Sequence, residues 1–249
     1  MARFRLPPPV DPSIARVLRE QLASWHVRVW LGLAVLLTAI LVQLPLFGVV
    51  GFELGLVAAA FGSLAGLALG TDLVRRAQAT HARPLDRAVS PARLVLSLAW
   101  RAPLAPLAVI AVPFAGAALH GIWAPTCDWG YGLEAFALLA VASTVLAAGS
   151  GMVIALCTGP RLLRIVPAII AVVVGLAAAG FYRFYSEPPV FSYNALIGFF
   201  PGNLYDEDIR LAGALYWSRL EQLATVAALL AAVTVLVDAP SLRLRLRAR

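Results

Sequence analysis

The chain has 249 residues, of which 61% are hydrophobic and 13% charged, and its formal net charge at pH 7 is +7. Such a composition excludes a soluble domain, because too few polar residues are present to cover the surface of a globule of this size. The sequence therefore predicts an integral membrane protein. All 20 basic residues are arginines, which excludes a phosphate-binding loop built around a lysine.

Residues 11–25 predict an amphipathic helix at the amino-terminal end. The segment opens with Asp11 and Pro12, a pattern typical of a helix start, and continues with apolar residues at helical spacing. We expect this helix to lie along the inner membrane surface. A solvated helix that packs on the protein's own loops is the alternative.

Six apolar runs predict spanning helices, because about 20 residues at a rise of about 1.5 Å each cross the hydrocarbon core. They cover residues 29–50, 52–71, 102–122, 133–156, 165–182 and 220–237. The first run is longer than the apolar part of a signal peptide, and no small-residue cleavage motif follows it, so we expect a retained span. We predict an all-α protein in which residues 1–249 form a single transmembrane domain.

The arginines predict the orientation, because positively charged short loops stay in the cytoplasm. They gather before the first run, in the loop 71–101, after the fourth run and in the tail 238–249. We expect these segments and both termini to be cytoplasmic, in a bacterial cytoplasmic (inner) membrane. Tryptophans at the predicted inner borders (Trp25, Trp30, Trp100) and outer borders (Trp123, Trp129, Trp217) agree with this topology.

The net positive charge is interpreted as an orientation signal with attraction to anionic lipid, so we expect the bilayer as a partner and no nucleic acid. Arg183, Arg210 and Arg219 are the arginines on the predicted outer side. Few charged residues fall inside the predicted spans, where they would indicate function.

Small residues indicate where the predicted spans pack. Gly62, Gly66 and Gly70 recur every four residues in the second run, which places them on one helical face. Gly149 and Gly151 indicate a similar contact in the fourth run. Small residues of this kind let two helix backbones approach closely.

Catalytic and metal motifs are not found in the sequence. The three histidines form no H-E-x-x-H pair, and Cys127 and Cys157 flank a predicted span, too far apart for a disulfide. We therefore expect no catalytic residue, no metal site and no cofactor in this chain.

The segment 183–217 is the most varied part of the sequence, rich in aromatic residues and interrupted by prolines. Its apolar piece "VFSYNALIGFF" is too short to cross, and we expect an outward re-entrant segment that dips into the membrane and returns. The acids at 206–208 are interpreted as caps of the last span, with a calcium site as the alternative. The candidate residues of this segment are Tyr193, Phe199, Phe200, Tyr205, Asp206, Glu207 and Asp208.

The predicted topology resembles that of the membrane (permease) subunit of type-2 ABC transporters. "LDRAVSPARLVLSLAW" is similar to the cytoplasmic loop of that family between spans two and three, where a proline turn precedes a basic residue and the next span. "CTGPRLLRIVPAI" is similar to the link between its fourth and fifth spans. The resemblance covers most of the chain and rests on topology and diffuse patterning.

The resemblance implies that two such subunits pair, as a homodimer or heterodimer, and that separate ATP-binding subunits dock beneath them. ATP would then bind to the partner, and residues 11–25 and 81–93 would receive its motion. By the same resemblance, the coupling residues would be Arg16, Arg19, Arg83, Asp86, Arg87 and Arg93.

The apolar, glycine-rich spans favour a lipid-like or amphipathic cargo over an ion. The alternative function is a non-catalytic membrane scaffold whose outward segment binds a periplasmic or extracellular partner.

Overall fold

The structure, a computed structural model, describes residues 14–44, 46–80, 90–124, 128–159, 161–186, 191–201, 211, 213–238 and 242–244. The amino-terminal half contains α1 (Ile14–Leu22), α2 (Trp25–Leu41), α3 (Phe52–Thr80), α4 (Pro91–Arg101) and α5 (Leu104–His120). After these come α6 (Trp129–Phe136), the π-helix η2 (Ala137–Val141), α7 (Ala142–Thr158) and α8 (Leu162–Ser186). The chain then forms β1 (Phe191–Asn194), β2 (Gly198–Pro201), α9 (Gly213–Leu236), β3 (Val237–Asp238) and β4 (Arg243–Leu244).

The predicted helical class is confirmed, and the helices suit a multi-pass membrane protein by length and composition. Among the described residues, five helical segments are long and apolar enough to cross a membrane: 52–79, 92–120, 129–158, 162–182 and 213–236. The pair α1 and α2, bent by 83° at its break, counts as a sixth span if the two helices are taken together. The strands form two short antiparallel hairpins beside this helical framework.

Several predicted boundaries differ from the structure. The predicted span 29–50 is wrong in its second half, because α2 ends at Leu41 and turns follow. That part of the sequence contains Gln43 and Pro45, which do not favour an apolar helix. The helix predicted at 52–71 continues to Thr80, and the last helix begins at Gly213 instead of residue 220. Arg219 therefore lies inside the helix.

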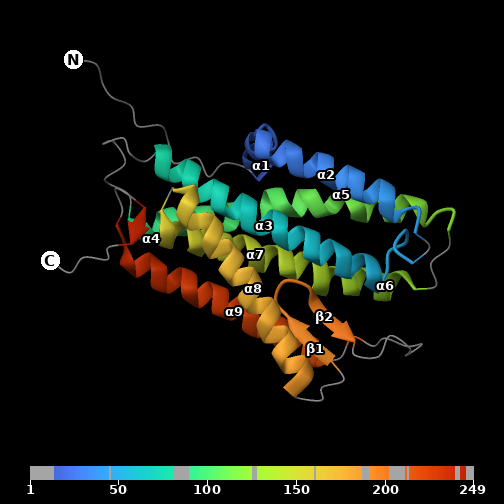
Figure 1. Cartoon of the computed structure of the whole chain (residues 1–249). Helices are drawn as coiled ribbons and strands as arrows, with labels where there is room; N and C mark the ends of the chain where they lie inside the picture. The colour runs from blue at the N-terminus through green and yellow to red at the C-terminus, as the bar shows by residue number, and fades with distance from the viewer. Residues whose placement is uncertain are drawn as a thin grey trace.

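The helices form a bundle with α3 and α7 at its centre (Figure 1). Helices α2 and α5 pack together on one side, and α8 and α9 lie on the other. The β1–β2 hairpin lies near the α6 end, while α1, α4 and β4 lie toward the opposite end of the bundle (Figure 1). The first and the last described elements therefore lie toward the same end.

Glycines of α3 allow the central contact with α7. A Cβ atom added to Gly66 would lie 2.8 Å from the backbone oxygen of Thr144. A Cβ atom on Gly62 or Gly70 would also clash with α7, at Thr144 and Ala148. From the other helix, Gly151 lies against the α3 backbone at Leu67. Larger side chains would force the two helices apart.

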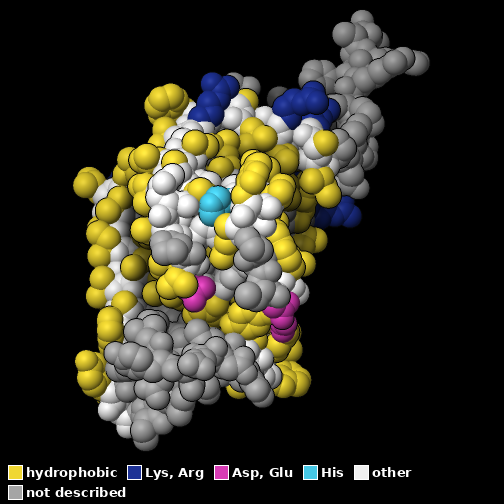
Figure 2. Space-filling model, turned by 90° about the vertical axis from the view of Figure 1, so that its right-hand side faces the viewer, with side chains coloured by type: hydrophobic (Ala, Val, Ile, Leu, Met, Phe, Trp, Pro, Cys, Tyr) yellow, Lys and Arg dark blue, Asp and Glu magenta, His cyan; other side chains and the backbone are white. Residues whose placement is uncertain are grey.

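The outer faces of α8 and α9 are apolar and little covered by the rest of the protein. In the most apolar stretch of each helix, 6% of α8 and 11% of α9 is buried, against 61% of α3. Figure 2, which looks onto the α6 end, shows hydrophobic side chains over most of the described surface and arginine side chains in the upper part of the view. Apolar surface of this extent requires contact with lipid or with another chain.

Candidate functional site

The β1–β2 hairpin has a tight three-residue tip that its sequence explains. Asn194 pairs with Gly198, so Ala195, Leu196 and Ile197 form the connection. The Asn194 side-chain oxygen accepts hydrogen bonds from the Leu196 and Ile197 N–H groups, at 2.8 and 3.4 Å. Gly198 has a φ of +101°, which a residue without Cβ adopts readily. The expected short apolar element is thus a β-hairpin.

The hairpin tip packs between helices instead of projecting from the bundle. The buried Ser63 hydroxyl of α3 donates to the Leu196 carbonyl oxygen at 2.7 Å, and the Asn194 amide donates to the Leu176 carbonyl of α8 at 3.3 Å. Ser63 is eleven residues into α3, or about 16 Å along the helix at about 1.5 Å per residue. The tip therefore reaches well into the bundle.

A buried arginine of α9 fixes this arrangement. Arg219 is 3% exposed, and its Nε donates to the Leu138 carbonyl oxygen at 2.9 Å. Its Nη2 donates to the Ser143 hydroxyl at 2.7 Å and lies 3.5 Å from the Leu139 carbonyl oxygen. Leu138 and Leu139 belong to the π-helix η2. A π turn departs from the α-helical register, and such turns are frequent at functional sites.

The same guanidinium group holds the hairpin. Its Nη1 donates to the Asn194 and Ala195 carbonyl oxygens at 3.4 and 3.3 Å, and to Gln222 Oε1 at 2.7 Å. A Cβ atom on Gly198 would lie 2.5 Å from Arg219 Nη2, so the glycine leaves room for the arginine. All three guanidinium nitrogens are thus occupied by protein acceptors.

Beneath the hairpin tip, helices α7, α8 and α9 surround a partly open cavity of about 550 Å³. Helices α8 and α9 make almost no contact with each other, so the cavity separates them. Most of its lining is aliphatic, and the hairpin tip forms one end. The apolar lining residues include Leu146, Val153, Ile154, Val172, Leu176, Leu196, Val226 and Leu229.

One face of α9 supplies most of the polar groups in the cavity wall. Ser218, Glu221, Gln222 and Thr225 recur at spacings of three and four residues, which places them on neighbouring turns of one helical face. Ser150 of α7 is the other hydroxyl in the lining. The cavity is therefore polar in the part of α9 near the hairpin and apolar farther along that helix. Such a site fits an amphipathic molecule.

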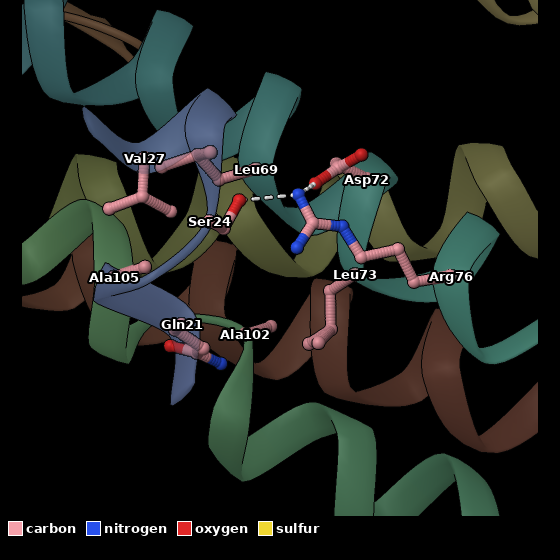
Figure 3. A pocket seen from close by; sticks show the side chains of 9 residues that line it. All are labelled: Gln21, Ser24, Val27, Leu69, Asp72, Leu73, Arg76, Ala102 and Ala105. Carbon is pink, nitrogen blue, oxygen red and sulfur yellow. Dashed lines mark hydrogen bonds and ion pairs between the residues drawn. The ribbon is translucent and has the colours of Figure 1, made fainter. Parts of the chain in front are cut away.

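A second polar group lies at the opposite end of the bundle, where α1 bends into α2. Arg76 of α3 donates to the Ser24 hydroxyl at 2.5 Å and pairs with Asp72 one turn earlier (Figure 3). The His26 Nδ1 atom lies 3.5 Å from Asp72. These contacts border a small pocket of about 30 Å³ and attach the bend between α1 and α2 to α3.

The candidate coupling residues that the structure describes lie at this same end. Arg16 and Arg19 are exposed on α1, and Arg93 is exposed on α4. Gln21 of α1 donates to the carbonyl oxygen of Arg101, the last residue of α4, at 3.0 Å. The predicted coupling residues Arg83, Asp86 and Arg87 lie outside the described residues.

Of the candidate outward residues, Tyr193 lies in β1 and Phe199 and Phe200 lie in β2. Tyr193 faces Phe199 in the register of the hairpin. The other four, Tyr205, Asp206, Glu207 and Asp208, lie outside the described residues. The calcium alternative therefore has no described ligand.

Neither Arg219 nor the polar stripe of α9, formed by Ser218, Glu221, Gln222 and Thr225, was identified as a site from the sequence. A signal was available, because Ser218, Glu221, Gln222 and Thr225 form a polar face around the start of the apolar run, and Glu221 carries a charge. Starting the last span at residue 220 had placed Arg219 outside the membrane. No sequence pattern indicated the π turn that receives it.

Comparison of the chain with protein-family models, curated protein sequences and solved structures finds no match.

Proposed function

We propose that this chain is a permease-like membrane subunit that binds and moves a lipid-like, amphipathic molecule, driven by a separate ATP-hydrolysing chain. The observation that carries the proposal is the cavity of about 550 Å³ between α7, α8 and α9, with its polar stripe at one end. An amphiphile that occupies it places its headgroup against the stripe and its chain against the aliphatic wall.

The position of the cavity supports movement within a bilayer. Its walls are formed by three helices that are long and apolar enough to cross a membrane. Since α8 and α9 scarcely touch, a ligand can enter sideways from the hydrocarbon layer without passing through water. In the proposed orientation the arginine-rich end faces the cytoplasm and the hairpin faces outward, so the headgroup end of the cavity lies on the outer side.

The bend between α1 and α2 supports coupling to a cytoplasmic partner. Helix α1 is amphipathic and carries exposed arginines. The bend that follows it is joined through the Arg76 contacts to α3, which packs against the central helix α7. A force on α1 therefore reaches one wall of the cavity through contacts between described residues. Two copies of the chain, or this chain and a related one, would pair around the transport path.

Purification of the tagged chain from native membranes in mild detergent tests the proposal. We expect an ATP-binding chain to co-purify in fixed proportion, and its ATP hydrolysis to increase when a long-chain amphiphile is added. Replacing Arg16 and Arg93 by glutamate should weaken this association. Replacing Glu53 by glutamine, at the far end of α3, should not.

Recovery of the chain with only an outward-side protein, and without ATP hydrolysis, would contradict the proposal and support the scaffold alternative.

A further inference from the structure

We propose that the cavity selects amphiphiles with a positively charged, hydrogen-bond-donating headgroup, and that the Glu221 carboxylate is the group that binds it. This inference rests on the proposed function and adds the chemical class of the ligand. It is carried by the placement of a carboxylate in the wall of a mostly aliphatic cavity, between helices long and apolar enough to span a membrane.

A carboxylate at this place requires an explanation. Glu221 follows the start of α9 by eight residues, about 12 Å at about 1.5 Å per residue, within a helix of mostly apolar residues. Ionised side chains inside spans are costly and commonly serve a ligand or ion path. Among the residues that the structure describes, none donates a hydrogen bond to this carboxylate or forms an ion pair with it.

The other polar groups of the stripe already have partners. Gln222 accepts from Arg219 and donates to the Ser218 hydroxyl at 3.2 Å. The Thr225 hydroxyl donates to the Glu221 backbone oxygen at 2.8 Å. The Ser150 hydroxyl donates to the Leu146 carbonyl of its own helix. The Glu221 carboxylate is therefore the charged acceptor that remains in the cavity wall.

An anionic headgroup finds no matching partner in this wall. The nearest cation along α9 is Arg219, which does not line the cavity and whose three nitrogens donate to protein oxygens. A sulfate or phosphate beside Glu221 would meet a like charge, and the residues that line the cavity include no cation to offset it. An ammonium group instead offers the Glu221 carboxylate a hydrogen-bond donor and an opposite charge.

The cavity also fixes the direction of the ligand. The stripe lies near the hairpin tip, while Val226 and Leu229 continue the same face of α9 toward its carboxyl end. An alkyl chain that starts at Glu221 therefore runs along Val226 and Leu229, opposite Val153 and Ile154 of α7. The headgroup is held at the hairpin end.

The test uses the full-length chain in phosphatidylcholine nanodiscs at pH 7. A fluorescent dodecyl probe with an uncharged headgroup is bound first. Dodecylammonium, dodecanol or dodecyl sulfate is then titrated in to displace it, and each competitor is measured by its concentration in the bilayer. We expect dodecylammonium to displace the probe at a concentration about tenfold lower than dodecyl sulfate, the effect of one charge-assisted hydrogen bond. Glu221→Gln should reduce this preference to within about twofold and leave probe binding intact.

Two controls separate the possible failures. Glu53→Gln removes an acid from the start of α3 and should keep the preference. Gly175 lines the cavity and has open space around it, so Gly175→Trp places an indole ring in the cavity and should weaken probe binding. Equal displacement by all three amphiphiles, or a preference that survives Glu221→Gln, overturns the headgroup assignment while the proposed function stands. Probe binding that is no greater in the original chain than in Gly175→Trp overturns the cavity as a ligand site and the proposed function with it.

Discussion

Replacing Arg219 by methionine should release the hairpin from the bundle. Methionine fills a similar space but donates no hydrogen bond, so six oxygen acceptors lose the guanidinium group. The Leu138 and Leu139 carbonyls and the Ser143 hydroxyl lie within the helices, and the Asn194 and Ala195 carbonyls lie at the hairpin tip. Little water is available there to replace the lost donor.

The expected loss of stability is about 2 kcal/mol. Three of the bonds, to Leu138, Gln222 and Ser143, are 2.9 Å or shorter, and side-chain bonds inside membrane proteins contribute about 0.6 kcal/mol each. Unpaired carbonyl oxygens add to the loss, whereas removal of a buried charge recovers part of its desolvation cost. We take these two smaller effects to offset each other.

Two measurements check this prediction. Reversible unfolding of the chain in detergent micelles gives the change in the free energy of unfolding, and hydrogen exchange of residues 194–197 reports on the tip. Arg219→Lys keeps the charge but replaces the planar guanidinium by a single ammonium, so it should recover less than half of the stability. If Arg219→Met unfolds at the same detergent composition as the original chain, with unchanged protection at the tip, the assigned role of Arg219 is wrong.

Three further predictions concern packing, orientation and coupling. Gly66→Leu should cost about 3 kcal/mol because its side chain meets the α7 backbone, whereas Gly175→Leu, with open space around it, should change the melting temperature little. In a variant without the native cysteines, Trp123→Cys should react with an impermeant thiol reagent from outside and Arg161→Cys only after permeabilisation; labelling of both from one side would refute the topology. Asp72→Asn should lower stability by less than about 1 kcal/mol but reduce stimulation of the partner's ATP hydrolysis, and full stimulation would contradict the coupling path.

Hydrophobic run length predicted well which segments form long apolar helices, because a span of about 20 apolar residues is a requirement of bilayer thickness. It predicted the ends of the helices less well. Apolar residues continue beyond Leu41 although the helix stops there, and polar residues such as Asp72 and Arg76 continue α3 after the apolar run ends. Hydropathy reports the solvent around a segment, whereas backbone hydrogen bonding decides where a helix terminates.

The site was harder to predict because it depends on contacts between distant segments. Arg219 is separated from Ser143 by 76 residues and from Asn194 by 25. The "NALIG" sequence favours a tight turn, since Asn194 and Gly198 suit its backbone, but the turn alone does not reveal that its tip enters the bundle. The polar face of α9 can be read from residue spacing, while the cavity it lines exists only because α8 and α9 stand apart.

Site-specific photo-crosslinking tests the central claim most directly. A benzophenone amino acid placed at Leu229, in the cavity wall, is compared with one at Val235, which is 85% exposed on the same helix. With a labelled long-chain alkylammonium in nanodiscs, we predict a saturable adduct at Leu229 that unlabelled ligand suppresses, and only a weak, non-saturable adduct at Val235. Equal, non-saturable labelling at both positions would show that the space between α8 and α9 is ordinary lipid contact and would contradict the account.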